Sequence, residues 1–297
     1  MQQQDCLRRF LFEQLGVRGE WVRLEQSWQQ AKQYRHIVNT AVDSQLGQAL
    51  VAVVLLAATI KFKGALIMQI QGSGELKALV AQCSHDRHIR GLVRSDAEVN
   101  AQNLQQMIGE GGRLVITVES ENSEAYQGIV AVQEDSLAEV LRSYFRQSEQ
   151  LNTRLWLFAN QTHAAGLFLQ ELPGNDQTEQ TAEDWQRLEL LANTLTAEEL
   201  LTLDCETLLH RLFHEEPVRL YDAESVAFVC GCSRAKISNT LTGLGKVELE
   251  TILAELEKIS VDCQFCGAQY QFDRVDVAEL FSKTIVENNV NRSTTQH

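Results

Sequence analysis

Proline is scarce in this chain of 297 residues, which contains only Pro173 and Pro217. Because proline interrupts helices and sheet ladders, its scarcity predicts long, uninterrupted elements. The hydrophobic fraction of 44% and the charged fraction of 22% are ordinary for globular proteins and argue against global disorder. The length is comfortable for two domains, so a sizeable core needs no disulfide support.

Signals for export and membrane insertion are also missing. Residues 1–10 lack the basic start, apolar run and small-residue cleavage site of a secretory signal, so we expect a cytoplasmic protein. The longest apolar run, residues 49–60, is far shorter than the roughly 20 residues that cross a bilayer. We interpret this run as a buried core helix.

An excess of basic residues is absent as well, since the formal net charge is −14. Most of this charge lies in residues 174–229, where 13 acidic and three basic residues give −10. Nucleic acids and anionic membrane surfaces bind proteins mainly through Lys and Arg. We therefore expect neither nucleic acid nor a membrane as a partner.

The first part of the chain predicts an α+β fold with predominantly antiparallel strands. Two β-rich runs flank Gly72-Ser73-Gly74 and predict a hairpin. Ser136 and Glu139 have the spacing of a capping box, and the apolar residues that follow recur at helical spacing. The predicted strands are residues 64–71, 75–82, 113–119, 127–132, 154–158 and 166–171.

The acidic segment has the periodicity of amphipathic helices. Thr181 and Thr196 resemble helix starts, and leucines between 188 and 212 supply apolar stripes. One interpretation is a set of helices docked permanently on a core. The other is conditional docking, because repulsion among the carboxylates favours an expanded form once the neighbours let go. We divide the chain into an α+β core domain (1–173), a helical linker (174–229) and a small C-terminal zinc-binding domain (230–297).

Seven cysteines, an odd number, in a chain without an export signal point away from a disulfide framework and towards metal or redox chemistry. Cys6, Cys83 and Cys205 are scattered, and we interpret them as small apolar residues. The other four form two pairs near the C-terminus, Cys230-Gly-Cys232 and Cys263-Gln-Phe-Cys266, separated by the 30 residues 233–262.

The two cysteine pairs predict a zinc site with Cys230, Cys232, Cys263 and Cys266 as ligands. In an extended segment residues i and i+2 face the same side, so the first pair presents both sulfurs to one point. The second pair does the same through a tight turn, helped by Gly267. Four thiolates satisfy the tetrahedral preference of Zn²⁺ and leave no open position for substrate water.

The segment that carries these cysteines, residues 230–297, is short and has modest apolar content. Structural zinc contributes roughly 10 to 16 kcal/mol in such modules, so removing the metal should unfold this one. Zinc also holds the sulfurs as oxidisable thiolates, and oxidation destroys the ligands. Two alternatives stay open on spacing alone: an inert structural zinc site, and a thiol-disulfide oxidoreductase site based on the CxxC motif.

At these residues the sequence resembles the 33 kDa heat-shock chaperones. The resemblance covers about residues 5 to 285, and its C-terminal part rests on 228–234, 263–267 and 270–272. Upstream segments in the expected order are 17–20, 61–64, 69–72, 126–130, 144–151, 153–156, 164–166 and 214–216. Asn39 and Asn152 stand where the family commonly has proline, and residues 84–112 match poorly.

The resemblance implies a redox-regulated, ATP-independent holdase rather than an enzyme. In such proteins the reduced form, with one Zn²⁺ per chain, is inactive. Oxidation releases zinc and forms disulfides within each motif, here Cys230–Cys232 and Cys263–Cys266. The linker is then destabilised, the protein tends to form a homodimer, and exposed surface captures unfolding client proteins until an ATP-driven foldase system takes them. The alternatives are a constitutive protein-interaction module with an inert zinc site and a thiol-disulfide oxidoreductase.

Overall fold

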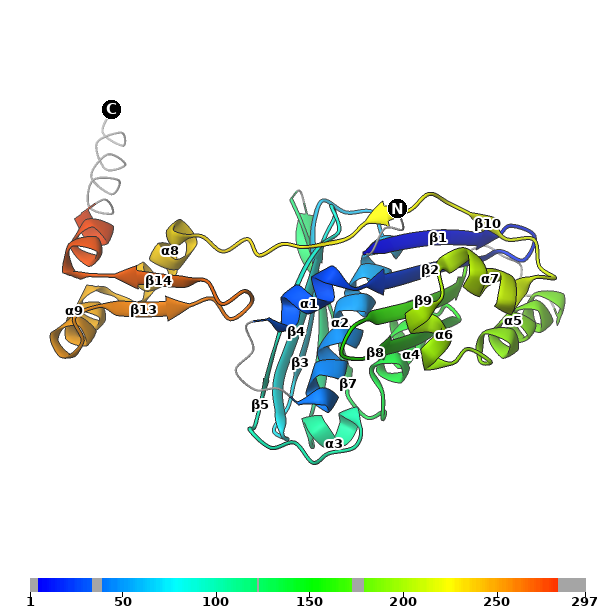
Figure 1. Cartoon of the computed structure of the whole chain (residues 1–297), viewed down its shortest axis with the longest axis horizontal. Helices are drawn as coiled ribbons and strands as arrows, with labels where there is room; N and C mark the ends of the chain where they lie inside the picture. Colours follow the sequence, from blue (N-terminus) through cyan, green and yellow to red (C-terminus); the bar gives the residue numbers. More distant parts are fainter. Residues whose placement is uncertain (1–4, 34–38, 122, 173–178, 283–297) are drawn as a thin grey trace. The chain divides into compact units, whose positions relative to one another are not determined.

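The computed structural model describes residues 5–33, 39–121, 123–172 and 179–282. The chain forms two compact units, Met1–Val229 and Cys230–His297. The architecture is α+β with mixed and antiparallel sheets, as the sequence predicts (Figure 1). The predicted domain boundary at residue 173 lies outside the described residues.

The first unit contains a six-stranded antiparallel sheet in the order β10-β1-β2-β9-β8, with β11 also paired to β1. The central strand β9 is buried along nearly its whole length, because both faces of this sheet are covered. The strands are β1 (Cys6–Phe12), β2 (Val17–Leu24), β8 (Thr153–Ala159), β9 (Ala164–Glu171), β10 (Arg219–Leu220) and β11 (Glu224–Ser225).

A second six-stranded sheet has the order β12-β5-β4-β3-β6-β7 and is antiparallel except for the β12–β5 pair. The predicted hairpin around Gly72 and Gly74 is confirmed as β3 and β4. The strands are β3 (Gly64–Gln71), β4 (Leu76–Ser84), β5 (His88–Ser95), β6 (Arg113–Ser120), β7 (Ser123–Ala131) and β12 (Ala227–Phe228).

Helix α2 (Thr40–Thr59) is the centre of the larger hydrophobic core and packs against strands of both sheets (Figure 1). Its 20 residues are long and apolar enough to cross a membrane by composition, but they are mostly buried within the unit, as expected for a core helix. Residues 49–57 are all buried, which confirms the predicted core helix. The helix begins earlier than the apolar run because the Asn39 side chain accepts hydrogen bonds from the Ala41 and Val42 backbone N–H groups.

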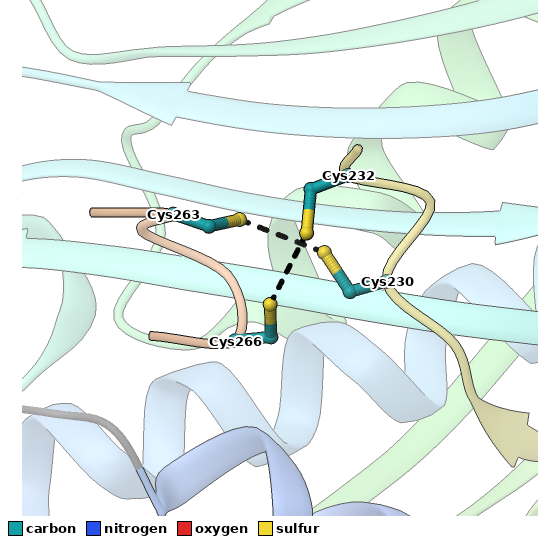
Figure 2. A group of neighbouring side chains, drawn as sticks. All are labelled: Cys230, Cys232, Cys263 and Cys266. Atoms are coloured by element: carbon teal, nitrogen blue, oxygen red, sulfur yellow. Dashed lines mark hydrogen bonds between the residues drawn. The ribbon is translucent and has the colours of Figure 1, made fainter. Parts of the chain in front are cut away.

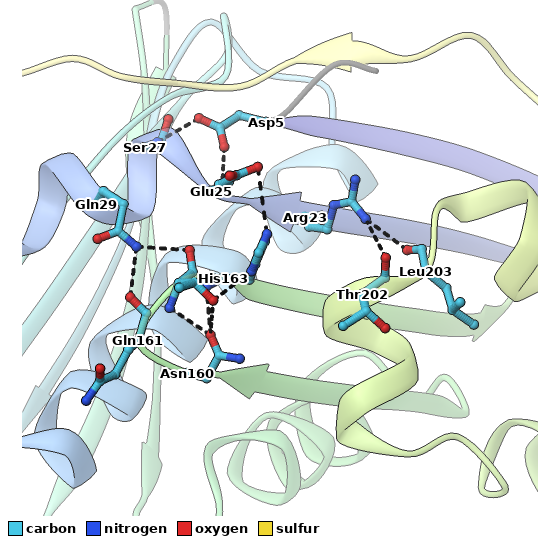
Figure 3. Close-up of polar contacts among 11 residues, drawn as sticks. Asp5, Arg23, Glu25, Ser27, Gln29, Asn160, Gln161, His163, Thr202 and Leu203 are labelled. Atoms are coloured by element: carbon cyan, nitrogen blue, oxygen red, sulfur yellow. Dashed lines mark hydrogen bonds and ion pairs between the residues drawn. The ribbon is translucent and has the colours of Figure 1, made fainter. Parts of the chain in front are cut away.

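Three further helices complete this part of the unit: α1 (Gln26–Lys32), α3 (Leu104–Ile108) and α4 (Leu137–Ser148). Helix α4 begins where predicted, with Ser136 accepting a hydrogen bond from the Glu139 N–H. Helix α1 lacks a cap from its own N-cap residue, and the Asp5 carboxylate accepts from the Glu25 and Ser27 backbone N–H groups instead (Figure 3).

The acidic segment forms α5 (Glu179–Ala192), α6 (Ala197–Thr202) and α7 (Cys205–Phe213). The Thr196 helix start is confirmed by a complete capping box. The Thr181 start is wrong, because α5 already begins at Glu179; acidic residues are favoured at a helix N-terminus, and this extends the first turn upstream.

These helices cover the face of the first sheet opposite α2 and form a second core. Alternation along β1 places Leu7 in the α2 core and Phe10 and Phe12 in the second core. The rings of Phe12 and Phe213 meet edge to face with centroids 5.1 Å apart. Trp185 is 8% exposed, which confirms its predicted role in helix packing. The Arg23 guanidinium donates to the Thr202 and Leu203 carbonyls at the end of α6 (Figure 3).

The second unit is small. It contains α8 (Arg234–Leu244), α9 (Lys246–Glu255), the antiparallel pair β13 (Ile259–Asp262) and β14 (Gln269–Phe272), and a helical stretch at 274–282. Its described core consists of Leu241, Leu249, Leu253, Ile259, Phe272 and Val277. So few buried side chains make this unit dependent on a further source of folding free energy.

Candidate metal centre

The structure brings the four C-terminal cysteines together in the second unit. Their Sγ atoms all lie within 4.8 Å of one another, and this is the one His/Cys/Asp/Glu group of metal-binding geometry among the described residues. The shortest contacts join the two motifs: Cys230 to Cys263 at 3.6 Å and Cys232 to Cys266 at 3.4 Å. Figure 2 shows all four side chains converging on one point.

The second motif lies in the turn between β13 and β14. The register pairs Asp262 with Gln269, so the strands hold the two ends of the turn in place. Within the turn the Gly267 N–H donates to the Cys263 carbonyl at 2.7 Å. Gly267 has φ 68°, a left-handed conformation that favours glycine, which confirms the role predicted for it.

The first motif follows β12 directly and leads into α8. Ser233 caps α8 by accepting a hydrogen bond from the Lys236 N–H. The Lys236 ammonium in turn donates to the Gly231 carbonyl at 2.7 Å, which fixes the backbone between Cys230 and Cys232. The helix cap and the β-hairpin therefore position the two halves of the centre.

The donor set fits Zn²⁺. A tetrahedral site with zinc–sulfur bonds of about 2.3 Å has sulfur–sulfur edges of about 3.8 Å, close to the 3.4 and 3.6 Å contacts described here. All four ligands are soft thiols, which select zinc over hard cations such as Mg²⁺ and Ca²⁺. Such a closed Cys₄ set has no open position for substrate.

The thiols of the centre differ in their tendency to ionise. The Tyr270 hydroxyl donates a hydrogen bond to Cys232 Sγ at 3.1 Å and lowers the pKa of this thiol to about 7. Burial raises the pKa of Cys230, and it raises the pKa of Cys266 to about 12. Four neighbouring thiolates therefore require a cation to balance their charge, which is consistent with a metal site.

Tyr270 is a member of the centre that the sequence reasoning missed. It lies on β14, four residues after Cys266, and pairs with Val261. Its hydroxyl reaches a sulfur of the other motif only because the hairpin folds back, so the contact depends on tertiary structure. The signal in the sequence was its place in a conserved-looking run of strand residues after the second motif.

The three scattered cysteines lie in the first unit and are buried, at 6%, 0% and 3% exposure for Cys6, Cys83 and Cys205. Burial raises the pKa of all three thiols, to about 12 for Cys83 and Cys205. Such thiols stay protonated and react poorly with oxidants. Their interpretation as small apolar core residues is confirmed.

The comparisons with known proteins agree with this geometry. The profile of the protein family described as "Hsp33 protein" matches residues 5–273, most of the chain. The chain belongs to the Hsp33 family. Hsp33 proteins are redox-regulated chaperones and not enzymes, which excludes the thiol-disulfide oxidoreductase alternative.

Individual Hsp33 relatives match over nearly their whole length. The 33 kDa chaperonin of Nitrosococcus oceani is 51% identical over 285 residues, covering 96% of this chain and 97% of the relative. The 33 kDa chaperonin of Pseudomonas aeruginosa PAO1 is 46% identical over 286 residues, covering 95% and 96%. The crystal structure of the 33 kDa chaperonin of Thermotoga maritima has the same fold, with a TM-score of 0.79, 23% identity and coverage of 94% and 99%.

Proposed function

We propose that this Hsp33 chain is an ATP-independent holdase that becomes active when its four-cysteine centre is oxidised. The observation that carries the proposal is a cluster of four cysteine sulfurs within 4.8 Å, placed in a unit with a very small core. In such a unit the state of the sulfurs decides whether the unit stays folded. A chemical change is thereby converted into a conformational one.

In the reduced protein, Cys230, Cys232, Cys263 and Cys266 hold one Zn²⁺ per chain. When bound, the metal neutralises the thiolates and supplies folding free energy, roughly 10 to 16 kcal/mol in structural zinc sites. The protein contributes the β-hairpin turn, the α8 cap and the Tyr270 hydrogen bond, which hold the sulfurs in position.

Oxidation joins Cys230 to Cys232 and Cys263 to Cys266. Each disulfide forms as two thiolates give two electrons to a peroxide molecule, which takes up two protons and leaves as water and the corresponding alcohol or a second water. Family membership supports pairing within each motif, and sulfur distances below 4.8 Å permit it. Once the sulfurs are paired, they no longer serve as metal ligands and the second unit unfolds.

Unfolding of residues 230–297 releases the preceding linker, residues 174–229. Its net charge of −10 favours an expanded form once its anchor is lost. The apolar faces of α5 to α7 and of the first sheet then become accessible to unfolding client proteins. We further propose that the oxidised protein forms a homodimer in the cytoplasm and passes its clients to an ATP-driven foldase system. Residues 1–173 are the core domain of this arrangement.

Zinc release and holdase activity should be measured on the same sample. Reduced protein is treated with hypochlorite, or with peroxide and mild heat, while a chromogenic chelator reports free zinc and light scattering reports aggregation of a thermally unfolding enzyme. We expect release of one zinc per chain together with suppression of aggregation. Unchanged zinc retention with no gain in suppression would overturn the proposal in favour of an inert zinc site.

A matched pair of variants assigns the response to the correct cysteines. Replacing Cys230, Cys232, Cys263 and Cys266 together by serine removes the zinc and the response to oxidant. Replacing Cys6, Cys83 and Cys205 by alanine leaves all four sulfurs of the centre in place. This second variant should release zinc and gain activity as the parent protein does.

A further inference from the structure

The last eleven residues of the first unit cover the edges of both of its large sheets. We call residues 219–229 the edge strap. Its strands β10 and β11 pair with β1, and its strand β12 pairs with β5. Within the described residues, the edge strap is the only partner on these outer sides of β1 and β5. The strap ends directly before Cys230.

Backbone hydrogen bonds attach the edge strap. On the β1 side, Tyr221 N–H donates to the Arg9 carbonyl at 2.9 Å and Val226 N–H donates to the Asp5 carbonyl at 3.1 Å. On the β5 side, Ala227 N–H donates to the Arg87 carbonyl at 3.2 Å and Val229 N–H donates to the Ile89 carbonyl at 3.0 Å. Contacts of this type read the backbone of the covering segment, so many sequences can make them.

The side chains of the strap alternate between buried and exposed. Val226 is 4% exposed and belongs to the α2 core, and Glu224 and Phe228 are half-buried beside it. Ser225, Ala227 and Val229 between them are exposed. An extended chain with an acidic residue followed by apolar residues at the second and fourth positions therefore fits this edge.

The acidic position has a specific partner. Glu224 Oε1 lies 2.9 Å from Arg9 Nη2, and Glu224 Oε2 lies 3.1 Å from Arg87 Nε. The Arg87 side chain is only 10% exposed. If the strap left, this buried guanidinium would lose its carboxylate, which is unfavourable. A replacement segment that carries a carboxylate at the same position would restore the pair.

The strap is held over short stretches only. Each of its three strands is two residues long, and β12 pairs with only two of the eight residues of β5. Short exposed edge segments open at a small fraction of the global free energy of unfolding. Uncovered sheet edges then present rows of unpaired N–H and C=O groups, which readily accept another extended chain.

We propose that the edges of β1 and β5 are a docking site for an extended segment of an unfolding polypeptide, which adds as a β-strand in place of the edge strap. The preferred segment carries an acidic residue followed by apolar residues two and four positions later, as Glu224, Val226 and Phe228 do. This inference rests on the proposed function, because unfolding of the unit that begins at Cys230 frees the end of the strap.

A fluorescent peptide with the sequence of residues 222–229, Asp-Ala-Glu-Ser-Val-Ala-Phe-Val, is the probe. Its binding to full-length protein is measured by fluorescence anisotropy in the reduced, zinc-loaded state and after oxidation. We expect binding to the oxidised protein that is at least about tenfold tighter than binding to the reduced protein. Equal affinity for both states would overturn the proposal.

Two modified peptides test the mode of binding. N-methylation at the positions of Ala227 and Val229 removes the two donors to β5 and should weaken binding by about tenfold or more, since each net hydrogen bond contributes about 1 kcal/mol. A scrambled peptide of the same composition keeps the hydrophobicity but loses the alternation. If either modified peptide binds as well as the parent peptide, docking by strand addition is wrong.

Two variants loosen the strap without oxidation and so separate this inference from the redox function. Glu224→Gln weakens the contacts with Arg9 and Arg87, and Val226→Ser removes the buried anchor. With native circular dichroism, both reduced variants should bind the peptide more tightly than the reduced parent protein, and unchanged affinity in both would overturn the inference. Failure of the oxidised parent to suppress aggregation would instead overturn the proposed function.

A second copy of the chain is the competing occupant. If straps exchanged between two molecules filled the edges, the oxidised protein would elute as a dimer and peptide binding would fall as the protein concentration rises. That result would overturn the proposal. Peptide affinity that is independent of protein concentration supports a client segment as the occupant.

Discussion

The hydroxyl of Tyr270 donates a hydrogen bond to the sulfur of Cys232, 3.1 Å away, and so joins the second strand of the hairpin to the first cysteine motif. The bond withdraws electron density from the sulfur and makes it a weaker nucleophile. Outer hydrogen bonds of this kind tune metal ligands as well as orienting them.

Tyr270→Phe should therefore make the reduced, zinc-loaded protein more sensitive to peroxide. All four sulfurs are already deprotonated when the metal is bound, so the change acts on nucleophilicity. Loss of one hydrogen bond of about 1 kcal/mol corresponds to zinc release that is between about twofold and tenfold faster. The rate is followed with a chromogenic chelator. Tyr126→Phe, in the other unit, is the control, and equal rates for the two variants would contradict the prediction.

Removal of zinc from the reduced protein should unfold the second unit selectively. Its described core has six buried apolar residues, too few to replace metal binding worth roughly 10 to 16 kcal/mol. We expect a strong chelator to make residues 230–282 sensitive to protease while a fragment ending near residue 229 survives. Mass spectrometry of the digest locates the cuts. Protection of residues 230–282 after complete zinc removal would refute this dependence.

Phe213→Ala should loosen the helices of the acidic segment. The Phe213 ring is 2% exposed and meets Phe12 edge to face, so its removal leaves a cavity that costs about 3 to 5 kcal/mol. We expect faster amide hydrogen exchange in α5 to α7 and partial holdase activity without oxidant. Leu190→Ala is the control, because this leucine lies on the same segment and is 61% exposed. A parent-like exchange pattern in Phe213→Ala would argue against this packing.

Glu20 should give the stability of the first unit a distinctive pH dependence. Burial raises the pKa of this carboxyl from 4.5 to about 7, although Arg18, Arg9 and Arg87 act in the opposite direction. The folded state then binds a proton that the unfolded state has lost, so stability is greatest below about pH 4.5 and falls as the pH rises to about 7. The effect is on the order of 3 kcal/mol.

Glu20→Gln should remove this pH dependence, because the amide does not titrate. The free energy of unfolding, measured with urea between pH 5 and pH 8, should fall less steeply with pH than in the parent protein. Glu98→Gln alters an exposed carboxylate and is the control. A slope in Glu20→Gln that matches the parent slope would show that Glu20 does not cause the dependence.

The sequence predicted the features whose signals are local. The spacing of the two cysteine motifs predicted that four sulfurs meet, and the apolar run from Ala49 predicted the core helix. The Gly72 to Gly74 turn and the Ser136 and Thr196 caps were located correctly. In each case a short stretch of residues specifies its own geometry.

Features that depend on tertiary contacts were missed. Strands β1 and β2 carry arginines in mid-strand and have both faces covered, so the simple alternation of a half-buried strand is absent. The strands of the edge strap are too short for any periodicity. The Tyr270–Cys232 bond depends on how the hairpin returns to the first motif. None of these patterns is visible without the partner segment.

The centre also closes a long loop, because it joins Cys230 and Cys232 to a turn that begins 31 residues later at Cys263. Opening the centre frees the entropy of that loop, whereas rebuilding it requires both motifs to find each other again before metal is held. Reduction alone therefore restores the thiols sooner than it restores the fold. The chaperone should show hysteresis, with activity that persists for a time after the oxidative challenge has ended.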